Sequence, residues 1–137
     1  MIVLWVQPGV LARTLRPGYG SSPVKRFDID HWVHEVKRFG IKSVICLLAK
    51  ELELYEDVLR EEGGLLGHYR AQGWVVHSVP VEENELFPFL LELEDLMAVE
   101  QAFLQSPIPV LIHGSAGLVR TAVAVIHLKQ RGLVKGA

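Results

Sequence analysis

The stretch that decides the fold is VLIHGSAGLVRT, residues 110–121. It opens on three large apolar residues, which predict a buried strand, and a turn of mostly small residues follows. The segment from Val119 to Gln130 is apolar enough to predict a central helix. In α/β proteins ligands bind where a buried strand ends and the next helix begins, so we place the functional site in this turn.

Strands and helices alternate along the rest of the chain. The apolar patterns and the glycines that end them predict strands at Met1–Val6, Ile41–Leu48 and Trp74–Val81, and helices at Asp28–Phe39, Glu51–Glu62, Leu65–Gln72 and Leu86–Leu104. This alternation predicts an α/β fold with a central, mostly parallel sheet flanked by helices.

Composition limits the classes of protein that this chain can represent. Its 137 residues, half of them hydrophobic and 22% charged, predict one globular domain spanning residues 1–137. The 14 Lys and Arg residues against 16 Asp and Glu residues give a net charge of -2. A nucleic-acid or membrane-surface binder carries a basic excess, so we expect neither partner.

The compartment is predicted from the single cysteine and from the start of the chain. Cys46 lies in an apolar run and predicts a structural thiol in a reducing compartment, for which we take the cytoplasm. The first six residues lack the basic region of a signal peptide and are too few to span a bilayer.

The turn after the last predicted strand has the properties of an anion site. Small residues let backbone N–H groups approach an anion, and the start of the next helix adds partial positive charge. Arg120 can hold two phosphate oxygens at once. We therefore expect a phosphate monoester to be bound by Gly114, Ser115, Ala116, Gly117, Leu118, Val119 and Arg120.

These residues resemble the signature of the protein tyrosine and dual-specificity phosphatases, which is a strand, His-Cys-x5-Arg-Thr and a hydrophobic helix. His113, Ser115–Gly117, Arg120 and Thr121 match it, and the size resembles the compact dual-specificity branch with its bacterial and archaeal members. Trp5–Ala12, Gly40–Ile45 and Val79–Val81 resemble that branch's opening hairpin, second strand and strand before the acid loop. The resemblance implies a tyrosine phosphatase-like fold and hydrolysis of phosphate monoesters through a phosphocysteine, without a cofactor.

The chain departs from the signature at the nucleophile, where Gly114 stands in the place of cysteine. Without a thiolate the phosphocysteine cannot form, so the chain is expected to bind phosphate and not to hydrolyse it. The glycine has two explanations, an engineered inactive variant, which we favour, or a natural pseudophosphatase that binds phosphorylated proteins. Loss of the thiolate charge favours phosphate binding, whereas the freedom of glycine lets the loop relax, and the sequence leaves this balance open.

The resemblance also implies a general acid, which in the family is an aspartate after the preceding strand. This chain has VPVEENE at residues 79–85, where Glu83 best matches the position by counting from Pro80, with Glu82 and Glu85 as alternatives. Glutamate can perform general acid chemistry. An equally weighted interpretation is that all three are solvated loop carboxylates.

Three other residues of the turn take roles from the resemblance. Thr121 matches the hydroxyl that contacts the cysteine sulfur, and in this chain it can instead cap the helix or bond the loop. His113 matches the residue that stiffens the loop by hydrogen bonding to its backbone. Ser115 is not expected to replace the nucleophile, because no activating base is evident nearby.

The remaining interpretations concern ligands and the end of the chain. Leu118 and Val119 stand where phosphoinositide-directed members carry lysines, so we expect a phosphorylated protein or a small phosphate ester. His31 and His34 have no third ligand at suitable spacing, and we expect no metal. Family members continue into one or two further helices beyond the position of Ala137, so the domain is either minimal or cut at its end.

Overall fold

A computed structural model describes residues 3–82, 91–115 and 119–136 of the chain. Its strands are β1 (Leu4–Gln7), β2 (Leu11–Thr14), β3 (Ser43–Cys46), β4 (Val75–Ser78) and β5 (Val110–His113). Its helices are α1 (Arg26–Arg38), the short 3₁₀ helix η1 (Lys50–Tyr55), α2 (Gly64–Ala71), α3 (Leu93–Gln105) and α4 (Val119–Gln130).

The strands form one sheet in the order β1-β2-β5-β3-β4. β1 and β2 are an antiparallel hairpin, and the other three pairings are parallel. The α/β class, the opening hairpin and the mostly parallel sheet expected from the sequence are thereby confirmed.

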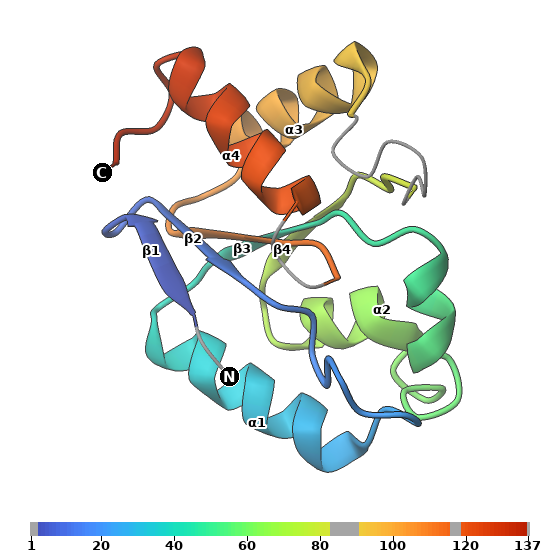
Figure 1. Ribbon diagram of the computed structural model, residues 1–137. Coiled ribbons are helices and arrows are strands. Elements are labelled where there is room, and N and C mark those ends of the chain that lie inside the picture. Colours follow the sequence, from blue (N-terminus) through green and yellow to red (C-terminus); the bar gives the residue numbers. More distant parts are fainter. Residues whose placement is uncertain (1–2, 83–90, 116–118, 137) are drawn as a thin grey trace.

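Helices cover both faces of the sheet, with α1 and α2 on one side and α3 and α4 on the other (Figure 1). Successive residues of β3 and β5 alternate between the two cores: Val44 and Leu111 pack with α1 and α2, whereas Ile45 and Ile112 pack with α3 and α4. Burial on both faces is the reason why these strands read as continuous apolar runs in the sequence.

The central position of β5 places the carboxyl ends of β2, β5 and β3 side by side at one end of the sheet. His113, the last residue of β5, is opposite Thr14 of β2 on one side and Cys46 of β3 on the other. Because these strands run parallel, the segments that follow them leave the sheet together. The turn after β5 is therefore flanked by the chain after Thr14 and the chain after Cys46.

The predicted helix from Glu51 to Glu62 is wrong. The structure has η1 and then a series of turns. Hydrogen bonds such as that from Glu56 N–H to Glu53 O join residues three positions apart, whereas those of an α-helix join residues four positions apart. Glu53 lies three and four positions before Glu56 and Asp57, and like charges at this spacing destabilise an α-helix.

The predicted helix from Leu86 to Leu104 begins too early, although residues 86–90 lie outside the described part. α3 starts at Leu93, after Leu91 and Glu92, which are not helical. The start is fixed by a capping box, in which Glu92 accepts a backbone hydrogen bond from Asp95 and the Asp95 side chain accepts one from Glu92. The apolar period continues upstream of this cap, which is why the sequence pattern alone placed the start too early.

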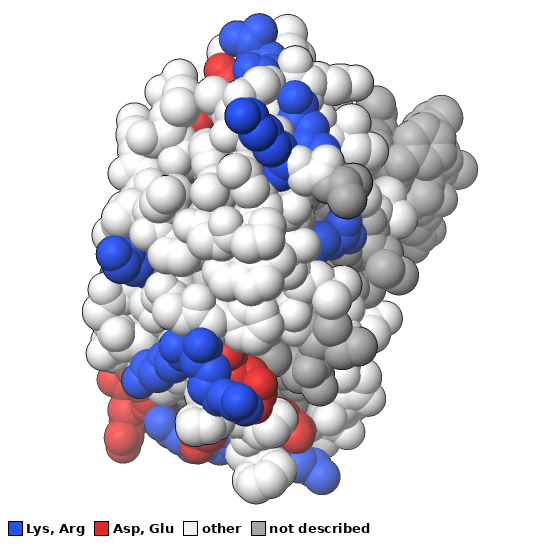
Figure 2. All heavy atoms as spheres, turned by 90° about the vertical axis from the view of Figure 1, so that its left-hand side faces the viewer, with Lys and Arg blue, Asp and Glu red and all other residues white. Residues whose placement is uncertain are grey.

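The edge of the sheet at β1 is weakly charged. Figure 2 shows this side of the molecule, with a central uncharged area, Lys and Arg groups above and below it, and Asp and Glu gathered in its lower part. Leu4 and Trp5 of β1 are 56% and 37% exposed.

Within the described ranges, none of the helices has the length and apolar character needed to cross a bilayer.

A buried carboxylate connects α3 with the C-terminal part of α4 and the residue that follows it. Glu100 of α3 is only 6% exposed, and its Oε1 lies 2.9 Å from Nε of Arg131 and 3.2 Å from Nε2 of His127. Hydrogen bonds to buried charged groups contribute more to stability than those between neutral groups.

Replacing Glu100 by glutamine is expected to lower the free energy of unfolding by about 1–3 kcal/mol, because Arg131 loses its charged acceptor. Urea unfolding at neutral pH measures the change. Glu56→Gln, the same substitution at an exposed position, is the control and is expected to leave the midpoint unchanged. Equal midpoints for the two variants would show that the cluster contributes nothing.

Candidate functional site

His113 is fully buried at the end of β5 and is held by two hydrogen bonds. Its Nδ1 lies 2.9 Å from the carbonyl oxygen of Gly114, and its Nε2 lies 2.9 Å from the hydroxyl of Tyr69. A carbonyl can only accept, so Nδ1 carries the proton and Nε2 accepts from the tyrosine hydroxyl. The ring also packs edge-on against Trp32 and Tyr69.

The surroundings of His113 keep its ring neutral. Burial lowers the pKa of His113 to about 4, and the positive charges of Arg120 and Arg16 act in the same direction, against the hydrogen bond to Gly114. With both nitrogens occupied by protein groups, the ring has no free atom to offer a ligand. The geometry supports a role in fixing the backbone where the loop begins.

Gly114 is the first residue of the loop, and its N–H donates to Oγ1 of Thr121 at 2.9 Å. This bond ties the loop start to the first turn of α4. A Cβ built on Gly114 would lie 3.3 Å from that Oγ1 and 3.6 Å from Nε of Arg120, and the φ of Gly114 is not in the left-handed region. The backbone conformation therefore does not demand glycine, and a small side chain fits if the threonine shifts slightly.

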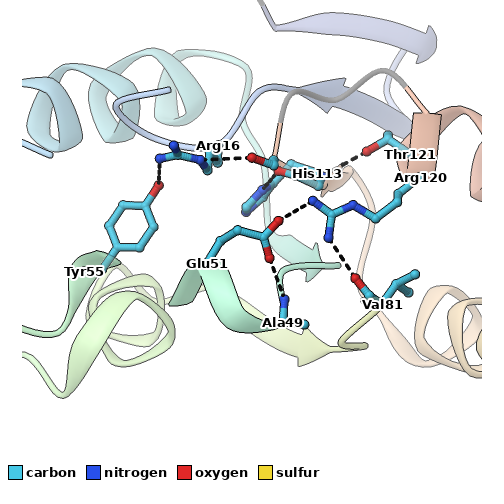
Figure 3. A network of polar contacts seen from close by, with 10 residues as sticks. Arg16, Ala49, Glu51, Tyr55, Val81, His113, Arg120 and Thr121 are labelled. Atoms are coloured by element: carbon cyan, nitrogen blue, oxygen red, sulfur yellow. Dashed lines mark hydrogen bonds and ion pairs between the residues drawn. The ribbon is translucent and has the colours of Figure 1, made fainter. Parts of the chain in front are cut away.

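Arg120 is 7% exposed and points back across the end of the sheet (Figure 3). One terminal nitrogen donates to the carbonyl oxygen of Val81 at 2.7 Å, and the other forms a short ion pair with Glu51. Partial burial alone would raise the pKa of the Glu51 carboxyl, but the hydrogen bond and charge of Arg120, with two backbone hydrogen bonds, lower it below its ordinary value. Glu51 is thus a charged partner of Arg120.

A second arginine lies on the other side of the loop start. The backbone N–H of Arg16 donates to the Ser115 carbonyl at 2.8 Å, and its Nε donates to the Ser115 hydroxyl at 3.1 Å. Its Nη1 donates to the hydroxyl of Tyr55 at 3.1 Å, and that hydroxyl donates to the carbonyl of Pro17. Figure 3 shows Arg16 and Arg120 reaching the loop from opposite sides.

The structure brings together His113, Gly114, Ser115, Arg120 and Thr121 of the predicted site. Val119 is exposed at the start of α4. The predicted loop residues Ala116, Gly117 and Leu118, and the carboxylates Glu83 and Glu85, lie outside the described part. Glu82 is described and exposed, and it lines a cavity together with Glu51.

Cys46 is a core residue, as expected from its apolar run. It is fully buried in β3, and burial raises the pKa of its thiol to about 12. A thiol with that pKa is a poor nucleophile at neutral pH. Across the described ranges, no three His, Cys, Asp or Glu side chains are grouped closely enough to hold a metal ion.

Sequence reasoning missed Arg16, Glu51 and Tyr55, although a signal for two of them existed. Arg16 follows the second strand of the hairpin, and Glu51 follows the predicted strand Ile41–Leu48. Both strands end beside β5, and ligand sites of parallel sheets are built from the segments after such ends. No local pattern marks Tyr55, whose contact with Arg16 spans 39 residues of sequence.

Comparison with known proteins agrees with this geometry at the level of the fold. No protein-family model matches the chain, and no curated protein matches it by sequence. The core catalytic domain of the PP-IP phosphatase Siw14 from S. cerevisiae, solved with citrate, superposes on 97% of this chain and 68% of its own, with a TM-score of 0.60 and 18% identity. The chain has a tyrosine phosphatase-like fold.

Two further solved structures share this tyrosine phosphatase-like fold. A DUF442 protein of Shewanella putrefaciens CN-32, named as a candidate phosphatase, covers 98% of this chain and 74% of its own, with a TM-score of 0.63 and 18% identity. A second Siw14 catalytic core covers 97% and 68%, with a TM-score of 0.57 and 19% identity. The resemblance first seen in residues 113–121 is confirmed for the architecture around them.

The neutral ring of His113 predicts a loss of stability in mild acid. The unfolded histidine titrates near 6.5 and the folded one at about 4, so the unfolded state binds more protons between these values and stability falls as the pH falls. From pH 7 to pH 5 this one group is expected to cost about 2 kcal/mol. His113→Asn, which can still donate to the Gly114 carbonyl, should reduce the loss by about that amount in urea unfolding.

The control for this measurement is His31→Asn, which removes an exposed histidine from α1. It is expected to retain the full wild-type loss between pH 7 and pH 5. If His113→Asn showed the wild-type loss as well, the histidine would not be buried in neutral form.

Proposed function

We propose that this chain is a phosphatase-type domain that binds phosphate monoesters at residues 113–121 and does not hydrolyse them, because Gly114 supplies no nucleophile. The observation that carries the proposal is the position of Gly114. It lies between the Thr121 hydroxyl and the Arg120 guanidinium, at the end of the central strand of a tyrosine phosphatase-like sheet.

The geometry supports a missing thiolate rather than a different reaction. A cysteine sulfur at position 114 would attack the phosphorus atom, the ester oxygen would leave with a proton from an acid, and water would then hydrolyse the phosphocysteine. Thr121 Oγ1 accepts the Gly114 N–H, and the hydroxyl can in addition donate its own proton toward a sulfur at this position. The Arg120 guanidinium would lower the pKa of that thiol.

Phosphate binding needs only the groups that remain. The start of α4 and the Arg120 guanidinium attract an anion, and the carboxylate of Glu51 already shows that this guanidinium binds an acidic group. A phosphate in the loop would compete with Glu51 or share the guanidinium with it. The absent cysteine removes one negative charge from the vicinity of the phosphate and favours its binding.

The ligand that we propose is a phosphorylated protein or a small phosphate ester, bound by a single cytoplasmic domain. Glu83, Glu82 or Glu85 would supply the acid in a form with the nucleophile restored. An engineered inactive phosphatase and a natural pseudophosphatase both bind phosphate at this loop. Restoring the thiol distinguishes two cases. If the chain lacks only its nucleophile, the restored thiol makes it an active phosphatase; if it also lacks other catalytic groups, it stays an inactive binding module.

Gly114→Cys is expected to hydrolyse p-nitrophenyl phosphate faster than the unsubstituted chain by on the order of 10³-fold or more, because nucleophile loss has effects of this size in other enzymes. Gly114→Ala, which adds the Cβ without sulfur, is the matched control and should remain inactive. Gly114→Cys combined with Cys46→Ser should keep the activity, since Cys46 is buried in β3.

Phosphate affinity of the unsubstituted chain is measured in the same series by calorimetry, with Arg120→Lys as the variant expected to bind at least about 10-fold more weakly. An inactive Gly114→Cys that still binds phosphate would favour the binding module. Absence of phosphate binding in every form would refute the proposed function.

Glu51→Gln is expected to raise phosphate affinity and to lower stability in phosphate-free buffer. The buried Arg120 charge loses its carboxylate, which costs about 1–3 kcal/mol, and an anion can then occupy the vacated position. Thermal unfolding with and without phosphate checks both effects, since phosphate should stabilise this variant more than the unsubstituted chain. Glu53→Gln, an exposed neighbour, is the control. An equal response of the two variants to phosphate would argue against competition by Glu51.

A further inference from the structure

Arg16 places a positive charge beside the loop that no acidic side chain of the described residues neutralises. Its hydrogen-bond partners are the Ser115 hydroxyl and the Tyr55 hydroxyl, both uncharged, and its guanidinium forms no ion pair there. Nη2 has no hydrogen-bond partner in the same ranges. Arg120, in contrast, is paired with Glu51.

The position of Arg16 is fixed by several contacts. Its backbone N–H and its Nε both bond Ser115, so the side chain follows the loop directly. Its guanidinium carbon lies 5.4 Å from the ring centre of Tyr19 and 6.0 Å from that of Tyr55. A guanidinium held in this way loses little conformational freedom when it binds an anion.

The charge around the loop is asymmetric. On the side of η1, a cavity is lined by Lys50, Glu51, Glu53, Leu54 and Glu82, of which three are acidic. A ligand group that carries negative charge is repelled there. On the opposite side, Arg16 borders a separate hollow of about 270 Å³ whose walls include Tyr19, His31 and Asp28. The Asp28 carboxylate in this hollow accepts a hydrogen bond from the Ser21 hydroxyl at 3.2 Å.

We propose that Arg16 binds a second anionic group of the ligand, a carboxylate or a further phosphate close to the phosphate held by the loop. This inference rests on the proposed phosphate binding at residues 113–121 and adds a selectivity to it. Nη2 of Arg16 supplies the donor, and the hydrogen bond from Nε of the same guanidinium to the Ser115 hydroxyl holds that guanidinium beside the loop. The preferred ligand is a phosphate ester with two neighbouring anionic groups.

Three small phosphate esters test the proposal by calorimetry with the full chain. Ethyl phosphate carries one anionic group, phosphoglycolate adds a carboxylate, and ethylene glycol bisphosphate adds a second phosphate. We expect at least one of the two esters with a second anionic group to bind about 10-fold more tightly than ethyl phosphate, as one charge-assisted contact provides. The ester that gains affinity identifies the group that Arg16 takes.

Arg16→Gln is expected to abolish this preference, so that the three esters bind this variant with affinities within about twofold of one another. Arg70→Gln, which removes one exposed positive charge from α2, is the control for net charge and should keep the preference. Arg16→Lys is the second variant and is used if the glutamine variant fails to fold. It retains the charge and should keep a reduced preference.

Several outcomes would overturn the inference. They are an unchanged preference in Arg16→Gln, equal affinities for the three esters in the unsubstituted chain, and equal affinities in Arg16→Lys. Binding of ethyl phosphate in these cases leaves the proposed function intact. If none of the three esters binds to the unsubstituted chain, the proposed function fails and the selectivity of Arg16 fails with it.

Discussion

Arg120 carries a permanent positive charge into a site where its side chain is only 7% exposed, and the surrounding structure is arranged to compensate it. A buried charge left without a partner costs several kcal/mol, so the chain must bring acceptors to it. Glu51 arrives from the segment after β3, and the Val81 carbonyl arrives from the segment after β4. The same guanidinium lies beside Gly114, so the compensation of one charge also shapes the loop.

The strand and the helix on either side of the loop were predicted closely from the sequence. β5 and α4 lie within one residue of their predicted bounds, because their apolar runs report burial directly. The segment after Glu51 failed for the opposite reason. Its charged residues face solvent, its amphipathic pattern is weak, and the contacts that decide its path, such as Arg120 with Glu51, are made with distant residues.

The residues of the candidate site also fall into two groups, those marked by a local sequence pattern and those brought to the loop by contacts between distant residues. His113, Gly114, Arg120 and Thr121 lie in one continuous stretch, and a motif of fixed spacing was sufficient to find them. Arg16 reaches the loop only because β2 pairs in parallel with β5, and the strand order of the sheet is not written in any local pattern. A sequence motif thus locates the loop, whereas the charged residues that flank the loop are brought there by the topology.

The hydrogen bonds that assemble the site join residues far apart in the chain. Arg16 and Ser115 are separated by 99 positions, and Arg120 and Glu51 by 69. Contacts of such high sequence separation form late in folding, because the entropy of closing long loops must be overcome first. An isolated segment containing residues 110–130, or a partly folded chain, lacks Arg16 and Glu51 at the loop. The arrangement of charges around the loop is therefore complete only when β2 and β3 have both paired with β5, so it belongs to the whole folded chain and to no fragment of it.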